Sequence, residues 1–351
     1  MKLSRVAIAT VALTSGHAFA QSQFPQSLRT NLGFVQSSYA TGLAAAVPPG
    51  VGTPPGRMWG VHADGGTIYA TGDGGLNYST NGGSTWNYFA NDADRYQTLD
   101  VYASGSSIYT ANALGVRFSN DGGATWNTAT SANGLQSGQV WDVWGSGSTV
   151  YAATDNGIGI SVDGGNSWNM RYPTRPWGAG VSEVRHVNVR DGVIYAGSRE
   201  GLCISTDGGA TWTIRQLGSF VQCYGVFATA DAIYAGAGDG LRKSTDGGST
   251  WTLTGAMAGV TGVQTVYDVF VVGNTIYGTY GAQGRSGSFI STNGGATWTR
   301  YSEGGTRFFA NESNAYLAGY SYVLVGAAVP APGALALLGM AGIAARRRRR
   351  D

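Results

Sequence analysis

Short runs of β-branched and aromatic residues, bounded by glycine-rich turns, recur along this chain and predict β-strands. The runs come in groups of four, and no stretch outside the two ends of the chain has helical periodicity. One run of each kind is residues 266–270, Ile276-Tyr277, Gly240-Leu241 and Thr250-Trp251. The pattern predicts an all-β protein built from repeated units of four strands.

The second run of each unit ends in a tyrosine that follows a small or branched apolar residue. Seven such tyrosines predict seven units. They are Tyr69, Tyr109, Tyr151, Tyr195, Tyr234, Tyr277 and Tyr316.

An eight-residue motif separates the third and fourth runs in six of the units. It reads Ser, any residue, Asp or Asn, Gly, Gly, a small residue, Thr or Ser, and Trp. Its tryptophans lie 40, 42, 44, 39 and 47 residues apart, which is close to the period of a four-stranded propeller blade. The paired glycines supply the positive φ angles that a tight hairpin needs.

This motif resembles the Asp-box, or BNR, repeat of sialidase-like β-propellers, and the resemblance covers about residues 57–326. The resemblance implies a structural role, in which the acid caps its own turn and the tryptophan packs against the blade. Asn in place of Asp is compatible with an Asx-turn. The residues concerned are Asn81, Trp86, Asp121, Trp126, Asp163, Trp168, Asp207, Trp212, Asp246, Trp251, Asn293 and Trp298.

The seventh unit has no such motif and shows only three strands before residue 326. An unpaired blade edge promotes association, so another segment has to cover it. Residues 30–39 contain Leu32, Phe34 and Val35 and are the candidate. We therefore expect a single seven-bladed β-propeller of four-stranded blades, with Asp-box turns between the third and fourth strands and an N-terminal strand that closes the ring.

Both ends of the chain have the features of export signals. Residues 1–20 combine Lys2 and Arg5 with an apolar run and a small-residue cleavage site, which predicts a secretory signal peptide. Residues 21–56 form the closing strand and a Pro/Gly-rich lead, and residues 57–326 the propeller. Residues 327–351 resemble a PEP-CTERM sorting tail, with a short proline motif, 13 apolar residues and five arginines. Thirteen residues are too few for a stable membrane span, so the tail is expected to be a transient inner-membrane anchor.

Removal of these ends changes the charge of the protein. Lys plus Arg falls from 22 to 15 and Asp plus Glu from 20 to 19, so the processed chain carries about −4. This charge argues against nucleic-acid binding. The sequence contains no phosphate-binding loop, dinucleotide fingerprint or paired-histidine zinc motif. Cys203 and Cys223 are the two cysteines; export permits a disulfide, and two buried free thiols are the favoured alternative.

Alignment of the units on their tyrosines reveals a polar column nine residues upstream, near the start of each first strand. We expect this column and the aromatic column just before it to line the channel mouth opposite the Asp-box turns. A long connection after the third motif is expected to reach the same face. The candidate ligand-binding residues are Trp59, Asp100, Trp141, Asp142, His186, Tyr267, Asp268, Arg307, Arg171, Arg175 and Trp177.

Two interpretations of this face are compatible with the sequence. In the first, the polar residues surround a water-filled channel. In the second, they bind a ligand, and carbohydrate suits the combination of aromatic faces with charged groups. No cofactor is required, although Asp100, Asp142 and Asp268 could together hold a calcium ion.

Three classes of function are compatible with the sequence: a glycoside hydrolase, an assembly factor and a binding module. A glycoside hydrolase would use two of the mouth carboxylates, but the Arg-Ile-Pro motif of sialidases is absent. An assembly factor would resemble the photosystem assembly propellers, which bind a protein through an arginine-rich surface. We favour an exported, exosortase-sorted, non-catalytic module at the cell surface or in the matrix. Its expected partners are signal peptidase, exosortase and an extracellular polysaccharide or surface protein, and it is expected to be a monomer.

Overall fold

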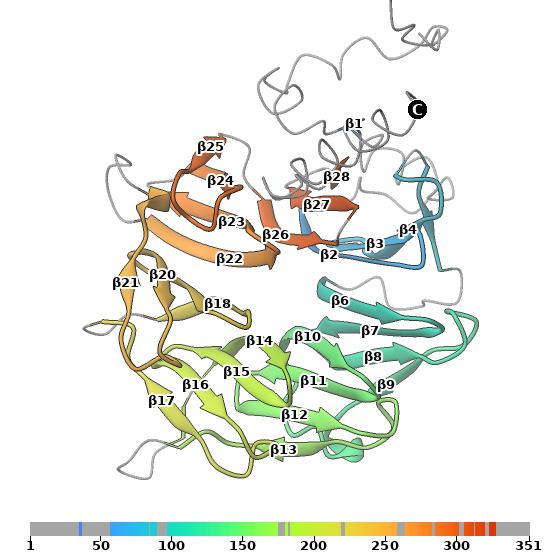
Figure 1. The fold of residues 1–351 in the computed structure, drawn as a ribbon. Helices are drawn as coiled ribbons and strands as arrows, with labels where there is room; N and C mark the ends of the chain where they lie inside the picture. The colour runs from blue at the N-terminus through green and yellow to red at the C-terminus, as the bar shows by residue number, and fades with distance from the viewer. Residues whose placement is uncertain are drawn as a thin grey trace, which may run out of the picture.

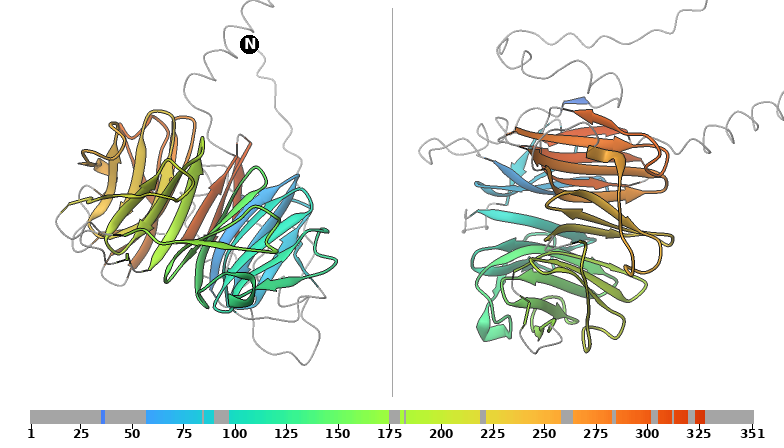
Figure 2. Two further views of the ribbon diagram at one scale, coloured as in Figure 1. Left: turned by 90° about the horizontal axis from the view of Figure 1, so that it is seen from below. Right: turned by 90° about the vertical axis from the view of Figure 1, so that its left-hand side faces the viewer.

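A computed structural model describes residues 35–36, 57–83, 85–89, 97–174, 180–181, 183–218, 222–257, 264–282, 285–301, 305–311, 313–319 and 323–327. Their strands form four-stranded antiparallel sheets arranged around a central axis as a β-propeller (Figure 1). The innermost strands pack against one another around the ring, and β26 packs against β2. Figure 2 shows the sheets standing side by side from two other directions.

Six sheets are complete blades of four consecutive strands, as the alternating runs predict. In the first three blades the strands are β2 to β5 (Met58–Asp64, Thr67–Gly72, Gly75–Ser79, Asn87–Tyr88), β6 to β9 (Thr98–Ser104, Ser107–Asn112, Gly115–Ser119, Asn127–Ala129) and β10 to β13 (Val140–Ser146, Thr149–Thr154, Gly157–Ser161, Asn169–Arg171).

In the next three blades they are β14 to β17 (Val184–Arg190, Val193–Ser198, Gly201–Ser205, Thr213–Arg215), β18 to β21 (Cys223–Ala228, Ile233–Ala237, Gly240–Ser244, Thr252–Leu253) and β22 to β25 (Gln264–Val272, Thr275–Ala282, Arg285–Ser291, Thr299–Tyr301). Two 3-10 turns follow outer strands: Ser131–Asn133 comes after β9 of the second blade, and Gly255–Met257 comes after β21 of the fifth.

The expectation of a seven-bladed propeller is wrong, because only six sheets in the described part of the chain are blades of four consecutive strands. The remaining sheet holds three consecutive strands, β26 (Gly305–Ala310), β27 (Asn314–Gly319) and β28 (Val323–Ala327). Its outer position is taken by the two-residue strand β1 (Val35–Gln36), which pairs antiparallel with β28. This sheet lacks the Gly-Gly turn that folds a fourth strand back in the other blades, so its outer strand comes from the N-terminal part of the chain.

The repeated motif forms the turn between the third and fourth strands of each complete blade. In the fourth blade the Ser205 hydroxyl donates to Asp207 Oδ1 (2.8 Å) and accepts from the Gly209 N–H (2.8 Å). Asp207 also accepts the Thr211 N–H (2.8 Å) and hydroxyl (2.5 Å). These hydrogen bonds, led by that from the Thr211 hydroxyl, lower the pKa of Asp207 to about 2. The acid is therefore occupied in holding its own turn.

The hydrophobic core lies between neighbouring blades rather than within one. Leu202 and Leu217 of the fourth blade, for example, pack with Val226 and Ile233 of the fifth. The motif tryptophans extend this packing, and Trp168 is 6% exposed while its Nε1 donates to Gly165 O (2.9 Å). Each blade can bury its faces only against the next, which is why the ring must close.

Both cysteines are free and buried on neighbouring blades, Cys203 on β16 and Cys223 on β18. Burial raises the pKa of Cys203 to about 12, so the thiol stays protonated and unreactive at neutral pH. No helix in the described part of the chain is both long enough and apolar enough to cross a membrane.

Candidate functional site

A β-bulge interrupts the innermost strand of every sheet at the same position. In β10 the register moves between Val140 and Asp142, so Trp141 is the extra residue opposite the partner strand β11. A bulge of this kind redirects side chains and increases the local twist. The extra residues are Trp59, Leu99, Trp141, Arg185, Tyr224, Tyr267 and Thr306.

All seven bulge residues line one pocket at the mouth of the channel. The pocket has a volume of about 300 Å³, within the lower range of small-molecule sites. Arg57, His186, Gly305 and Arg307 complete its lining. We call this cavity the mouth pocket.

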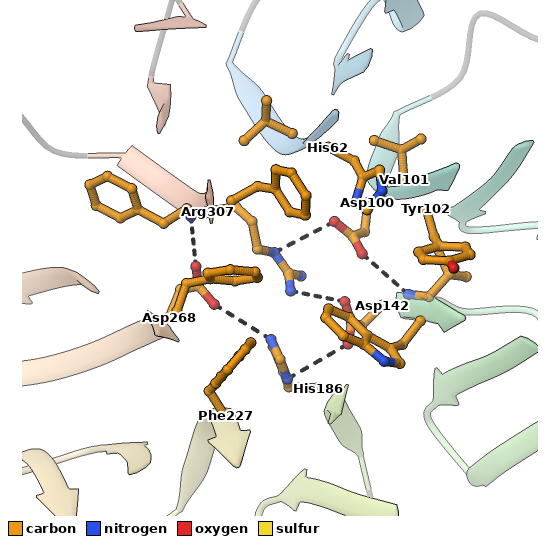
Figure 3. Close-up of a pocket in the computed structure, with 15 residues that line it drawn as sticks. His62, Asp100, Val101, Tyr102, Asp142, His186, Phe227, Asp268 and Arg307 are labelled. Atoms are coloured by element: carbon orange, nitrogen blue, oxygen red, sulfur yellow. Dashed lines mark hydrogen bonds and ion pairs between the residues drawn. The ribbon is translucent and has the colours of Figure 1, made fainter. Parts of the chain in front are cut away.

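The polar column lies directly below the mouth pocket, and its side chains contact one another across the axis. Arg307 reaches across the axis between two aspartates, with Nη1 2.8 Å from Asp142 Oδ1 and Nε 3.6 Å from Asp100 Oδ1 (Figure 3). His186 Nε2 lies 3.5 Å from Asp268 Oδ1. The free volume among these side chains is about 30 Å³, which is room for only a few water molecules, so the channel is narrow here.

The buried acids of this cluster differ in their affinity for a proton, and Arg307 is their nearest cationic partner. Burial raises the pKa of Asp100 well above its usual range, and the charge of Asp142 adds to the effect. Burial also acts to raise the pKa of Asp142, but Arg307 and His186 outweigh it and lower that pKa. Although burial opposes its charge, the three carboxylates raise the pKa of Arg307. Asp100 therefore has the higher proton affinity of the two, and Asp142 is the closer partner of Arg307.

The three aspartates also connect adjacent sheets through backbone hydrogen bonds. Asp142 Oδ2 accepts the Val187 N–H (2.7 Å), and Asp268 Oδ2 accepts the Phe308 N–H (2.7 Å). Asp100 Oδ2 accepts the Val143 N–H at 3.3 Å. Each carboxylate satisfies a buried donor of the following sheet, which is a structural function.

A ring of aromatic side chains closes the channel below the polar cluster. Its members stand two residues after the polar column, and successive rings contact each other around the axis at centroid distances from 4.2 to 6.3 Å. Asn188 occupies this place in the fourth blade and accepts the Ala228 N–H (3.1 Å). The ring consists of His62, Tyr102, Trp144, Phe227, Phe270 and Phe309.

Two tryptophans in the wall of the mouth pocket are held by aspartates of neighbouring loops. Trp141 Nε1 donates to Asp155 Oδ1 (2.7 Å), and Trp59 Nε1 donates to Asp73 Oδ1 (2.8 Å). Asp73 also accepts the Arg57 N–H (3.1 Å). Because the indole N–H groups are satisfied at the back, the ring faces are oriented by the protein before any ligand arrives.

A strained glutamate holds Arg185 between two aromatic rings. Glu183 has φ 49°, an uncommon angle for a residue other than glycine, and its carboxylate binds Arg185 (2.6 Å) and Arg199 (2.8 Å). The Arg185 guanidinium carbon lies 5.5 Å from the ring centroids of both Trp141 and Tyr224. The hydrogen bond from Arg185 leads the causes that lower the pKa of Glu183, so the clamp is ionised at neutral pH.

The structure divides the residues proposed from the sequence among three places. Trp59, Trp141 and Tyr267 line the mouth pocket, and His186 and Arg307 form part of its floor. Asp100, Asp142 and Asp268 lie below it and are 5%, 1% and 2% exposed.

Arg171 is not at the mouth. It lines a separate cavity with Val162, Ser167 and Gly208, beside the Asp-box turns. Arg175 and Trp177 lie outside the described residues.

Sequence reasoning missed several lining residues. The column expected at the mouth also contains Leu99, Arg185, Tyr224 and Thr306, but these four were not among its proposed ligand-binding residues. Their equivalent position in the first strand of each unit was the sequence feature that could have identified them. Arg57 lies just before β2, outside the aligned columns, so no sequence pattern indicated that it lines the pocket.

A calcium site does not form from the three aspartates, because the Arg307 guanidinium lies between two of them. In the described part of the chain, no group of three or more His, Cys, Asp or Glu side chains is arranged to hold a metal ion.

The fold is similar to that of several solved propellers. A structure of YCF48 bound to a D1 peptide has a TM-score of 0.63 and 16% identity, covering 80% of this chain and 95% of that one. Virginiamycin B lyase from Staphylococcus aureus has a TM-score of 0.60 and 13% identity, covering 78% and 95%.

The extracellular domain of the putative one component system BT4673 from B. thetaiotaomicron has a TM-score of 0.59 and 12% identity, covering 78% of this chain and 39% of that chain. At these identities the similarity establishes the β-propeller fold. No family model matches this chain, and no curated protein matches it.

Proposed function

We propose that this protein is a non-catalytic binding module that holds a saccharide in the mouth pocket. One observation carries the proposal: the bulge residues of all the innermost strands converge on a single pocket whose walls include Trp59, Trp141, Tyr224 and Tyr267. Flat aromatic faces pack against sugar rings, and arginine N–H groups bind hydroxyl and carboxylate oxygens. Hydrogen bonds to Asp73 and Asp155 hold two of these walls in place, which lowers the entropic cost of binding.

The position of the carboxylates favours binding over glycoside hydrolysis. Hydrolysis needs two carboxyl groups that flank the scissile bond. Asp100, Asp142 and Asp268 are almost fully buried, and each already accepts a backbone hydrogen bond from the next sheet. A sugar in the mouth pocket would meet Arg307 and His186 on the floor before it met these acids.

Peptide binding is the second candidate, corresponding to an assembly or scaffold role. The fold similarity to YCF48 bound to a D1 peptide supports it, together with the arginines of the mouth pocket. We rank it second because four aromatic walls around a compact pocket suit a ring-shaped ligand better than an extended chain.

We also propose that the module acts outside the inner membrane after export, with its C-terminal tail as a transient anchor that exosortase removes. The signal-peptide features of residues 1–20 and the PEP-CTERM-like order of residues 327–351 support this location. Intact-mass measurement of the protein from its host tests it. A mature species that retains residues 346–350 would contradict the proposed cleavage.

The binding proposal is tested by glycan-array screening followed by calorimetry and a product assay on the sugars that bind. Trp141→Ala and Tyr224→Ala should each weaken binding about tenfold or more, since truncation of a central aromatic anchor typically costs about 2 kcal/mol. Tyr88→Ala, on the outer strand β5, is the matched control and should bind like the parent. Binding unchanged in both pocket variants would refute the proposal, and release of cleaved sugar would favour the hydrolase alternative.

A further inference from the structure

The charged side chains that line the mouth pocket all have one sign. Among the described residues, Arg57, Arg185 and Arg307 contribute to the lining, and no Asp or Glu does. A ligand in the pocket therefore meets guanidinium groups as its nearest charged neighbours. A small surface site built this way attracts anionic groups.

Two of these arginines retain N–H donors beyond their internal contacts. Arg185 uses Nε (3.2 Å) and Nη2 (2.6 Å) for Glu183 Oε2, so Nη1 takes no part in that pair. Arg307 uses Nη1 for Asp142 and Nε for Asp100, so Nη2 lies outside both contacts. Their side chains are 36% and 16% exposed. Each guanidinium group is thus held by acidic side chains through two of its nitrogens. Its third nitrogen can donate to a ligand.

The acidic groups around the pocket stand behind these arginines and the tryptophans. Asp155 accepts from Trp141 Nε1, and Asp73 accepts from Trp59 Nε1 and the Arg57 N–H. Glu183 is engaged by Arg185 and Arg199. These contacts orient the walls of the pocket.

We propose that the mouth pocket recognises a sugar that carries a carboxylate, namely a hexuronic acid residue; this inference rests on the proposed saccharide binding. The sugar ring packs against the aromatic walls of the pocket, and the carboxylate binds the donors of Arg185, which lies between Trp141 and Tyr224. The aromatic walls distinguish this ligand from a free inorganic anion, because a phosphate ion would leave them without a contact.

Glu183 is a positioning residue in this proposal. It holds a left-handed backbone angle, and its N–H donates to Asp155 O (3.0 Å) while its carboxylate aims Arg185. Strain of this kind persists where surrounding contacts over-determine it, often at binding sites. The conservative variant Glu183→Gln keeps the shape and weakens the ionic hold on Arg185.

The test is calorimetric titration of the full chain with trimers of galacturonic, glucuronic and mannuronic acid, each beside its carboxyl-reduced neutral counterpart. At least one acidic trimer should bind about tenfold or more tightly than its neutral counterpart, as expected for loss of charge-assisted hydrogen bonds. Added salt should weaken the acidic ligand selectively. Equal binding of an acid and its counterpart would overturn the inference and leave saccharide binding intact. Failure of every trimer, with failure on the glycan array, would remove the proposed function itself.

Single substitutions test which side chains cause the preference for the acidic trimer. Arg185→Gln should remove the acid preference while the neutral trimer binds as before, and Glu183→Gln should reduce it in part. Arg190→Gln is the matched control, because Arg190 is on the same strand β14, pairs with Asp191 and does not line the pocket. An acid preference that survives Arg185→Gln would overturn the assignment. Tighter binding of a peptide with a free C-terminal carboxylate than of any trimer would identify a peptide ligand and also overturn it.

Discussion

Asp142 on β10 accepts a 2.7 Å hydrogen bond from the Val187 N–H on β14, and through its other oxygen it binds Arg307 of the last sheet. One carboxylate therefore joins three sheets, including two that lie far apart in sequence. At 1% exposure it does this without contact with solvent. The residue that the sequence suggested as a ligand group is thus buried among contacts between sheets.

Asp142→Asn should lower the free energy of unfolding by about 3 to 5 kcal/mol, the usual cost of breaking a buried ion pair by neutralising one partner. The remaining amide oxygen can still accept the Val187 N–H, so the effect reports on the charge. Chemical denaturation of the variant beside exposed Asp231→Asn provides the measurement and its control. Equal stability of the two would show that the ion pair with Arg307 is dispensable.

Asp207→Asn should preserve the fourth Asp-box turn, whereas Asp207→Ala should lower the melting temperature. Asn81 shows the reason, because its Oδ1 accepts the Ser79 hydroxyl (3.0 Å) and the Thr85 N–H (2.9 Å) just as an aspartate does. Thermal melts at pH 7 compare the two variants with the parent. A melting temperature for Asp207→Ala equal to that of the parent would contradict the structural role of the acid.

The Asp207→Asn variant also isolates the contribution of the ionised Asp207 carboxylate to stability. The pKa of Asp207 is lowered to about 2 in the folded protein, against about 3.9 when unfolded. Its stabilising contribution is present above pH 4 and lost as the pH falls through 2. Melting temperatures of the parent should therefore fall more steeply between pH 4 and 2 than those of Asp207→Asn. Parallel curves would show that this carboxylate does not contribute.

His62 should make stability depend on pH in a higher range. Burial lowers its pKa from 6.5 to about 4, despite the 3.0 Å hydrogen bond between Nε2 and Ala103 O. Between pH 6.5 and 4 the unfolded chain takes up a proton that the folded chain refuses, so stability falls as the pH falls. The full effect is on the order of 3 kcal/mol.

His62→Phe keeps an aromatic ring against Phe309 and Tyr102 and removes this proton. The difference in unfolding free energy between parent and variant should therefore change across pH 6.5 to 4. Asp100, whose raised pKa acts in the opposite direction, is common to both proteins and cancels in that difference. A difference that is constant with pH would contradict a neutral buried His62.

Deletion of residues 21–47 should leave the outer edge of β28 without a partner. Val35 and Gln36 pair there with Val325 and Leu324, and an open sheet edge promotes association between molecules. We expect a lower melting temperature and larger species in size-exclusion chromatography. A deletion variant that stays monomeric with an unchanged melting temperature would show that β1 is not needed for closure.

The sequence determined the repeated unit of this protein, because strand periodicity and the Gly-Gly turns act over a few residues. The turn around Asp207 forms from hydrogen bonds within seven residues of chain, and such local geometry can be read from a motif. The aligned columns likewise placed Trp141 and Asp142 at the start of the first strand.

Tertiary structure decided what those positions do. A bulge in β10 turns Trp141 into the mouth pocket and leaves Asp142 below it, although the two are adjacent in sequence. Arg307 neutralises Asp142 from 165 residues away, a pairing that depends on ring closure and not on local pattern. The missing motif of the last unit indicated that its outer strand comes from the N-terminal part of the chain, whereas the pairing of Val35 with Val325 is a long-range contact of the folded ring. Long-range contacts of this kind carry no periodic signal, so only the folded ring separates the residues buried between sheets from those that line the mouth pocket.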